Sequence, residues 1–179
     1  PSLFILRQQL IGLGKNDAPK AGWLQWKFRP VIKAFREAIQ AWLMILPIVL
    51  FVSWLSTTLA GDQGGANPLL ELVLGSKNLI ALFLLLLTTV VLAPLFEELI
   101  FRGALLPVLV KDFGKFGAVC ISALVFALAH LSIGELFPLL ALGLGLGFLR
   151  LSSGRLFPCV LMHSLWNGVT FSSLVLLGN

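Results

Sequence analysis

Long apolar runs, separated by short polar or Gly-rich stretches, occupy most of the chain after residue 37. A helix of roughly 20 apolar residues crosses a bilayer core that is about 30 Å thick. The pattern predicts five membrane-spanning helices, at residues 38–60, 79–110, 116–131, 136–151 and 156–177. These runs are too continuous for the alternation of about ten residues that is typical of a transmembrane barrel strand. We therefore predict an all-α fold, a polytopic transmembrane helix bundle of about five spans.

Residues 1–37 follow a different pattern, in which basic residues alternate with aromatic ones from about residue 15 onward. This pattern is typical of a segment that lies on an anionic membrane surface. A positively charged flank that only orients the first span would have the same composition. The predicted organisation is a basic interfacial arm at 1–37 and a transmembrane domain at 38–179.

Composition supports a membrane protein. Of 179 residues, 58% are hydrophobic and 12% are charged, whereas soluble domains carry about 25% charged residues. The net charge of +5 does not indicate a nucleic-acid partner, because the basic residues fall mainly before or between the apolar runs. Cys120 and Cys159 lie in apolar runs without metal-ligand spacing and are predicted to pack in the bundle.

The distribution of Lys and Arg predicts the orientation. Seven lie in the arm, two each in the turns at 111–115 and 150–155, and none in the turn at 132–135 or at the C-terminus. By the positive-inside rule, the N-terminus and the two basic turns lie on the cytoplasmic side, and the C-terminus lies on the opposite side. The identity of the membrane is open.

Two adjacent carboxylates and a guanidinium interrupt the second predicted span, at Glu97, Glu98 and Arg102, just after Pro94. An unpaired charge inside a span is costly, so such residues are functional candidates by default. Glu98 and Arg102 are four residues apart, which favours an ion pair on one helix face. Glu97 points about 100° away from Glu98. One carboxylate is therefore predicted to be structural and the other free for chemistry; the simpler alternative is a charge cluster that ends a span.

The two histidines of the chain, His130 and His163, both lie inside apolar runs. Glu97 precedes Lys111 by 14 residues, and His130 follows Lys115 by 15 residues. In continuous helices both side chains would then lie about 21 to 23 Å from the same face of the bundle. His163 would lie somewhat nearer that face. The spacing predicts that the three residues can converge.

His163 and Asn167 are also four residues apart and share one helix face. Both side chains can donate hydrogen bonds to a developing oxyanion. With Glu97 as general base, helped by His130, this set predicts attack by an activated water on an amide. Ser164 does not face His163 on a helix, so the pattern indicates no covalent serine nucleophile.

Three motifs, in chain order, are Glu97-Glu98-x-x-x-Arg102, Phe126-x-x-x-His130 and His163-x-x-x-Asn167. Together they resemble the motifs of the CPBP intramembrane proteases, the CAAX protease and bacteriocin-processing family, also called the Abi family. The resemblance covers roughly residues 79–170.

The resemblance implies an intramembrane endopeptidase whose water is activated by Glu97 and His130. It implies that His163 and Asn167 form the oxyanion hole. It also implies that Glu98 and Arg102 order the site and that Phe126 packs near His130. No cofactor is expected in this mechanism. A zinc site would instead use Glu97, His130 and His163, whose side chains are suitable zinc ligands.

The expected substrate is a membrane-embedded or lipid-anchored peptide or protein. The chain has fewer predicted spans than the eukaryotic CAAX-processing members, which leaves the CAAX substrate itself open. The alternative function is a non-proteolytic scaffold or immunity-type protein that binds partner membrane proteins. A transporter is less favoured, because the chain lacks paired broken helices in two matching halves.

Overall fold

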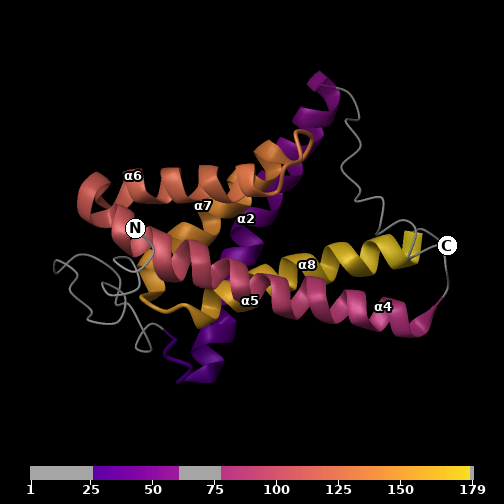
Figure 1. Ribbon diagram of the computed structural model, residues 1–179, viewed down its shortest axis with the longest axis horizontal. Helices are drawn as coiled ribbons and strands as arrows, with labels where there is room; N and C mark the ends of the chain where they lie inside the picture. Colours follow the sequence, from indigo (N-terminus) through magenta and orange to yellow (C-terminus); the bar gives the residue numbers. More distant parts are fainter. Residues whose placement is uncertain (1–25, 61–77, 178–179) are drawn as a thin grey trace.

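The computed structural model describes residues 26–60 and 78–177. Most of the predicted interfacial arm, residues 1–25, lies outside the described residues. The described helices are, in chain order, α2 (Val31–Ala60), α4 (Leu79–Leu86), η2 (Leu87–Leu92), α5 (Ala93–Glu98), η3 (Leu99–Leu105), α6 (Leu106–Ala129), α7 (Leu136–Ser153) and α8 (Phe157–Leu177). Figure 1 shows them packed as a helical bundle without strands in the described ranges. The predicted all-α membrane fold is confirmed.

Four helical stretches are long and apolar enough to cross a membrane: Val31–Leu59, Leu79–Ala129, Leu136–Ser153 and Phe157–Leu176. The second has 51 residues, which is about 76 Å at 1.5 Å per residue and more than twice the thickness of a hydrocarbon core. Its backbone reverses at Gly114, where φ is 69° and ψ is 176°, and Figure 1 shows α6 turning back near its start. A positive φ with this ψ is essentially restricted to glycine. The stretch therefore consists of two helical arms, 79–113 and 115–129, that meet at Gly114.

The first span begins earlier than the apolar pattern predicts, because α2 starts at Val31, directly after Pro30. Its first turns include the charged residues Lys33, Arg36 and Glu37, and Glu37 contacts another part of the bundle. Glu37 forms an ion pair with Arg155, from the turn before α8, and Arg155 also donates to the carbonyl oxygen of Pro30 at 3.4 Å. The predicted boundary between the arm and the transmembrane domain therefore falls inside a helix.

The helix that carries the Glu-Glu motif is wound irregularly on both sides of Pro94, as η2 before it and η3 after it. Pro94 has no backbone N–H, so it cannot complete a regular ladder of hydrogen bonds. The Ala93 N–H bonds the Thr88 carbonyl, five residues back. This is the π-helical pattern, which is frequent at functional sites. Two π-helical segments thus flank the short helix α5 that carries Pro94, Glu97 and Glu98.

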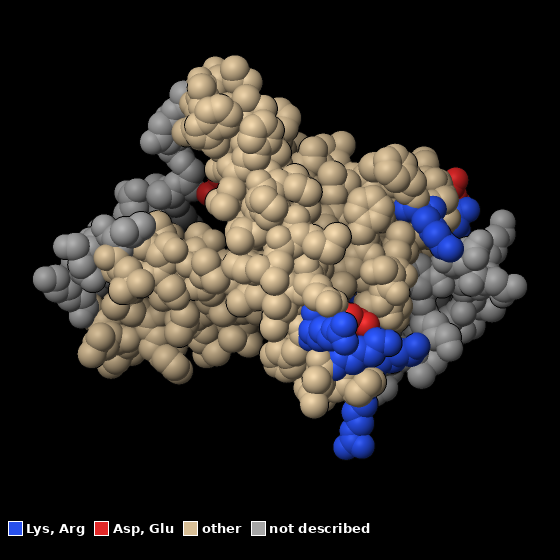
Figure 2. All heavy atoms as spheres, turned by 180° about the vertical axis from the view of Figure 1, so that it is seen from behind, with Lys and Arg blue, Asp and Glu red and all other residues tan. Residues whose placement is uncertain are grey.

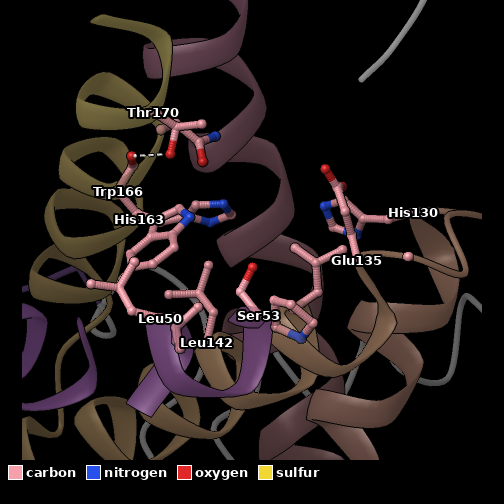
Figure 3. A pocket seen from close by; sticks show the side chains of 13 residues that line it. Leu50, Ser53, His130, Glu135, Leu142, His163, Trp166 and Thr170 are labelled. Atoms are coloured by element: carbon pink, nitrogen blue, oxygen red, sulfur yellow. Dashed lines mark hydrogen bonds between the residues drawn. The ribbon is translucent and has the colours of Figure 1, made fainter. Parts of the chain in front are cut away.

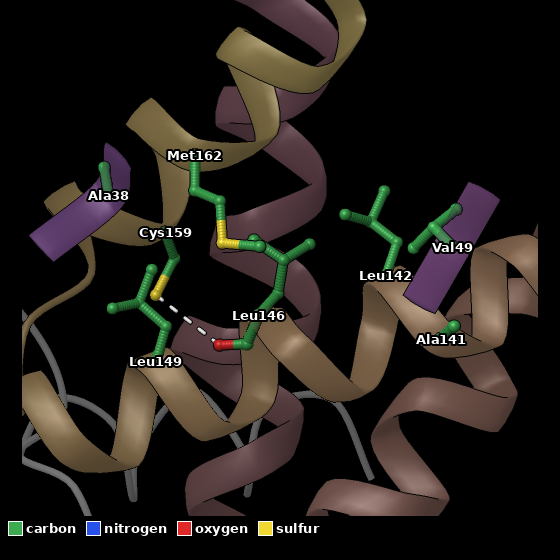
Figure 4. Packing of buried hydrophobic residues seen from close by; sticks show 8 residues of the cluster. All are labelled: Ala38, Val49, Ala141, Leu142, Leu146, Leu149, Cys159 and Met162. Carbon is green, nitrogen blue, oxygen red and sulfur yellow. Dashed lines mark hydrogen bonds between the residues drawn. The ribbon is translucent and has the colours of Figure 1, made fainter. Parts of the chain in front are cut away.

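Helix α7 packs against α2, α6 and α8. Figure 4 shows the core cluster around it, which comprises Ala38, Val49, Ala141, Leu142, Leu146, Leu149, Cys159 and Met162. The backbones of α6 and α7 approach closely: a Cβ at Gly143 would lie 3.1 Å from Ala123 Cα, and one at Gly147 would lie 2.9 Å from Val119 Cγ1. Small residues permit such close contacts between membrane helices.

Much of the outer surface is apolar, with large side chains such as Ile32, Met44 and Leu79 at least 75% exposed. Figure 2 shows the basic side chains of one face gathered toward one end, beside a broad surface on which no Lys or Arg is visible. An extended apolar exterior is unfavourable in water and suits a lipid solvent. The chain is therefore an integral membrane protein.

Candidate active site

A buried ion pair forms the centre of the site. Arg102 Nη1 donates to Glu98 Oε1 at 3.0 Å, and both side chains have an exposed fraction of 0%. Arg102 Nη2 donates to the Gly143 carbonyl at 3.0 Å, and the guanidinium carbon lies 4.4 Å from the centre of the Phe126 ring. Pairing, hydrogen bonding and a cation–π contact together allow these charges to remain buried.

Glu98 also orients His163, because His163 Nδ1 lies 3.0 Å from the same oxygen, Oε1. This oxygen also accepts from Arg102 and therefore carries no proton of its own, so the imidazole Nδ1 is the donor. His163 is nearly buried, with 2% of the residue exposed. Its position is therefore set by an acid on a different helix.

His130 is held by its own helix, since its Nδ1 lies 2.8 Å from the Phe126 carbonyl oxygen. A carbonyl oxygen can only accept, so Nδ1 carries the proton. The ring also packs edge-on against Phe126, with centroids 4.7 Å apart. Phe126 contacts the ring of His163 as well, with ring centroids 5.6 Å apart, so one aromatic ring packs against both imidazoles.

Glu97 faces both histidines. Its Oε2 lies 3.6 Å from His163 Nε2 and 3.9 Å from His130 Nε2. Because both Nδ1 atoms are donors, both neutral rings would present an Nε2 lone pair to the carboxylate. Three acceptors in one place repel one another unless a proton or a water molecule lies among them. The arrangement is therefore suited to holding and moving a proton.

Asn167 is fixed through the irregular helix that contains Pro94. Its Nδ2 donates to the Thr89 carbonyl at 2.9 Å. This carbonyl lies five residues before Pro94, which has no N–H to offer, while the Ala93 N–H is used by Thr88. The proline therefore leaves the Thr89 oxygen available for Asn167. The second N–H of the Asn167 amide is not needed for this bond.

A cavity of about 380 Å³ lies beside the histidines, and Figure 3 shows His130 and His163 facing it from opposite sides. Its walls come from α2, α7, α8 and the turn before α7. The described lining residues are Val49, Leu50, Ser53, His130, Gly134, Glu135, Pro138, Leu139, Leu142, His163, Trp166, Asn167 and Thr170. A group bound there would meet three of the predicted site residues directly.

The structure brings all seven predicted site residues together: Glu97, Glu98, Arg102, Phe126, His130, His163 and Asn167. Sequence reasoning missed the bond between His163 and Glu98, the carbonyls of Thr89 and Gly143, and Glu135 in the cavity wall. The contacts of His163, Thr89 and Gly143 join helices that are distant in sequence, so no spacing rule indicates them. Glu135 lies five residues after His130, in the turn before α7. Its closeness in sequence to the Phe126-x-x-x-His130 motif was the only signal that could have indicated it.

In the alternative zinc site, Glu97 lies farther from His130 and His163 than the ligand atoms of one tetrahedral zinc ion lie from each other. Zinc bonds of about 2.0–2.1 Å place neighbouring tetrahedral ligand atoms about 3.3 Å apart, and the two separations from Glu97 Oε2 are 3.6 and 3.9 Å. Within residues 26–60 and 78–177 no group of three or more His, Cys, Asp or Glu side chains is placed to hold a metal ion.

The fold and the site together define a multi-pass integral membrane protein with a charged centre buried among its helices. The family model described as type II CAAX prenyl endopeptidase Rce1-like matches residues 79–169. This match spans half of the chain and includes every motif residue, so the chain belongs to this family of membrane proteases. The resemblance indicated by the three motifs is thereby confirmed. No curated protein matched the chain, and no solved structure matched it.

Proposed function

We propose that the protein is an intramembrane endopeptidase that hydrolyses a peptide bond of a membrane-associated substrate with a water activated by Glu97 and His130. The observation that carries the proposal is the convergence of Glu97 Oε2 on the Nε2 atoms of two histidines that line one cavity. Family membership supports peptidase activity. A substrate in the membrane fits the family description, which names prenyl endopeptidases.

The reaction begins with a water molecule between Glu97 Oε2 and His130 Nε2. Both atoms accept, so the water donates a hydrogen bond to each and turns its oxygen lone pair toward the substrate carbonyl carbon. As the C–O bond forms, Glu97 takes a proton from the water. The same proton then passes to the leaving amine nitrogen as the C–N bond breaks. The products are a carboxylic acid and an amine.

The developing oxyanion needs donors. Asn167 offers the amide N–H that is not bonded to Thr89. His163 offers Nε2–H only when its ring is doubly protonated, because its Nδ1–H is committed to Glu98. The bond to Glu98 also holds the ring so that Nε2 faces Glu97 and the cavity.

The test is cleavage of a library of membrane-anchored peptides by the protein in lipid nanodiscs. We expect Glu97→Gln to lower kcat/KM by roughly 10²–10⁴-fold, the usual contribution of a general base. The matched control is Asp112→Asn, which removes an exposed carboxylate from the turn at the start of α6 and leaves the rate unchanged. Circular dichroism and thermal unfolding establish that each variant is folded.

Addition of a chelator separates the metal-free mechanism from the zinc alternative. We expect no effect of chelator on the wild-type rate. A rate that is lost with chelator and restored by zinc would overturn the metal-free mechanism. Full cleavage by Glu97→Gln would overturn the role of Glu97. Folded wild-type protein that cleaves no peptide of a broad library would overturn the endopeptidase function and favour a scaffold.

A further inference from the structure

Arg150 is a buried arginine that none of the three motifs contains. The sequence pattern places it in a basic turn, whereas in the structure it lies inside α7 with an exposed fraction of 0%. Its Nε donates to the backbone carbonyl of Arg102 at 3.2 Å. A guanidinium among membrane helices is costly unless its N–H groups find acceptors. The contact with Arg102 places this buried charge at the centre of the site.

The Arg102 carbonyl needs a donor from outside its own helix. At the end of η3 the Leu106 N–H bonds the Phe101 carbonyl, five residues back, so it does not serve Arg102. Pro107, five residues after Arg102, has no N–H. The donors of the α-helical and of the π-helical pattern are therefore both withdrawn, and a buried carbonyl without a donor is unfavourable. Arg150 supplies the N–H that the helix does not.

The same backbone arrangement also occurs at Thr89. There Pro94 withdraws the donor, and Asn167 binds the Thr89 carbonyl from another helix. Each of the π-helical segments η2 and η3 ends two residues before a proline, Pro94 or Pro107. Each segment thus leaves one carbonyl to a side chain of a different helix, on either side of the two carboxylates. By its contact, Arg150 is the counterpart of Asn167 on the second segment.

Helix α7 holds Arg102 at two points. Gly143 and Arg150 are seven residues apart in α7 and therefore lie on one face, almost two turns from each other. The Gly143 carbonyl accepts from Arg102 Nη2 at 3.0 Å, and Arg150 binds the main chain of the same residue. Arg102 Nη1 then meets Glu98 Oε1, the oxygen that accepts from His163. The position of His163 therefore depends on Arg150 through Arg102 and Glu98.

We infer that Arg150 is a positioning residue for the proposed reaction, which supplies the Arg102 carbonyl with the N–H that Pro107 lacks. The bond fixes η3 against α7 and so keeps the His163 imidazole opposite Glu97, 3.6 Å from its Oε2. The inference rests on the proposed function for the effect of Arg150 on catalysis. Its effect on the imidazole of His163 does not depend on cleavage.

The test returns the missing donor from within the helix. Arg150→Met removes the guanidinium and keeps an unbranched side chain. We expect kcat for a membrane-anchored peptide to fall roughly 10- to 100-fold, the effect of losing one buried hydrogen bond from a charged donor. KM stays near the wild-type value, because Arg150 is not among the described residues that line the cavity. Pro107→Ala provides an N–H for the Arg102 carbonyl, so Pro107→Ala/Arg150→Met recovers most of the lost kcat.

The matched control is Arg155→Met. Arg155 is also nearly buried, at 5% exposure, but it binds Glu37 and the Pro30 carbonyl. Pro107→Ala therefore gives no recovery in Pro107→Ala/Arg155→Met. Recovery in both double variants would show a general stabilisation by the alanine and would overturn the inference.

Nuclear magnetic resonance of the histidines separates this inference from the proposed reaction. His130 and His163 are the two histidines of the chain, so protein with ¹⁵N-labelled histidine and a histidine-free purification tag gives few imidazole signals in nanodiscs. His130→Gln assigns them. We expect the hydrogen-bonded Nδ1–H signal of His163 to shift or broaden in Arg150→Met and to return to its wild-type position in Pro107→Ala/Arg150→Met.

The His163 signal decides the inference even if the wild type cleaves no peptide. A wild-type signal in folded Arg150→Met overturns it, as does a shifted signal that Pro107→Ala does not restore. If Arg150→Met does not fold, a folded double variant with the wild-type signal supports the inference, and a double variant that also fails to fold overturns it.

Discussion

At the scale of single residues, one oxygen atom organises the site. Glu98 Oε1 accepts from Arg102 and from His163, each at 3.0 Å. This shared acceptor links the ion pair to the histidine that faces Glu97. Glu98 and Glu97 are neighbours in sequence, but one is buried at 0% exposure and the other has a side chain that is 29% exposed. Under the proposed function, the buried carboxylate orients His163 and the more exposed one takes the proton from water.

Removal of Arg102 tests this arrangement. Arg102→Met would leave Glu98 buried without its cation, so we expect the free energy of unfolding to fall by about 3–5 kcal/mol. Glu98→Gln/Arg102→Met recovers part of the loss, because it removes the unpaired charge. Denaturant titration in detergent measures both. Lys33→Met is the control, since this Lys is exposed and 3.9 Å from Glu37, and its loss should cost no more than about 1 kcal/mol. Equal stability of the single and double variants would contradict the role of the pair.

The carboxyl of Glu135 predicts a pH dependence of stability. Burial raises its pKa above the ordinary value of 4.5, so the folded protein binds this proton more tightly than the unfolded chain does. Stability therefore falls as the pH rises from the ordinary to the raised pKa. We expect Glu135→Gln to be more stable than the wild type above that range and equally stable below pH 4.5. Thermal unfolding across this pH range measures the difference in stability between Glu135→Gln and the wild type. A stabilisation that persists below the range would refute the raised pKa of Glu135 as its cause.

At the scale of elements, Pro94 and Gly143 connect backbone geometry to the site. Pro94 leaves the Thr89 carbonyl free for Asn167. Gly143 brings α7 close to α6 and presents its carbonyl to Arg102. Pro94 thus frees a backbone acceptor on Thr89, and Gly143 supplies one itself, each for a side chain of the site.

Two glycine substitutions distinguish close packing from ordinary contact. A Cβ at Gly143 would lie 3.1 Å from the backbone of Ala123, which cannot shift cheaply, whereas one at Gly168 would lie 3.5 Å from the Val90 side chain. We expect Gly143→Ala to lower the free energy of unfolding by about 1–3 kcal/mol and to reduce activity through Arg102. Gly168→Ala should be neutral or slightly stabilising. Denaturant titration compares the two variants. Equal effects would show that the contact at Gly143 does not limit how closely α6 and α7 approach each other.

At the scale of the whole molecule, the reversal at Gly114 sets which turns share a side of the membrane. The turn that contains Asp112 and the turn that contains Ile133 lie at opposite ends of the second half of α6. The positive-inside rule predicts that the first turn faces the cytoplasmic side.

Labelling with a membrane-impermeant maleimide tests this orientation. In a background of Cys120→Ala and Cys159→Ala, we expect Asp112→Cys to react from the cytoplasmic side and Ile133→Cys from the opposite side. Both positions are exposed on the surface of the protein, and each lies beside an end of the arm 115–129. Labelling of both from one side would contradict two crossings in the stretch from Leu79 to Ala129.

The sequence by itself determined the spans and the pairs within one helix. Apolar runs report burial in lipid directly, and a spacing of four residues places Glu98 beside Arg102 and His163 beside Asn167 on one face, because helix geometry is local. The start of α2 was missed, since charged residues in its first turns concealed the helix. One of them, Glu37, is paired with Arg155 in the turn before α8.

The tertiary structure alone decided how the helices meet. The bond from His163 to Glu98, the carbonyl that Thr89 offers to Asn167, and the place of Glu135 in the cavity wall all depend on contacts between distant segments. Such contacts follow from the angle and depth at which helices pack, which small residues and backbone irregularities set. Periodicity within one helix carries no information about them, so the candidate residues could be named from the sequence, and their arrangement could not.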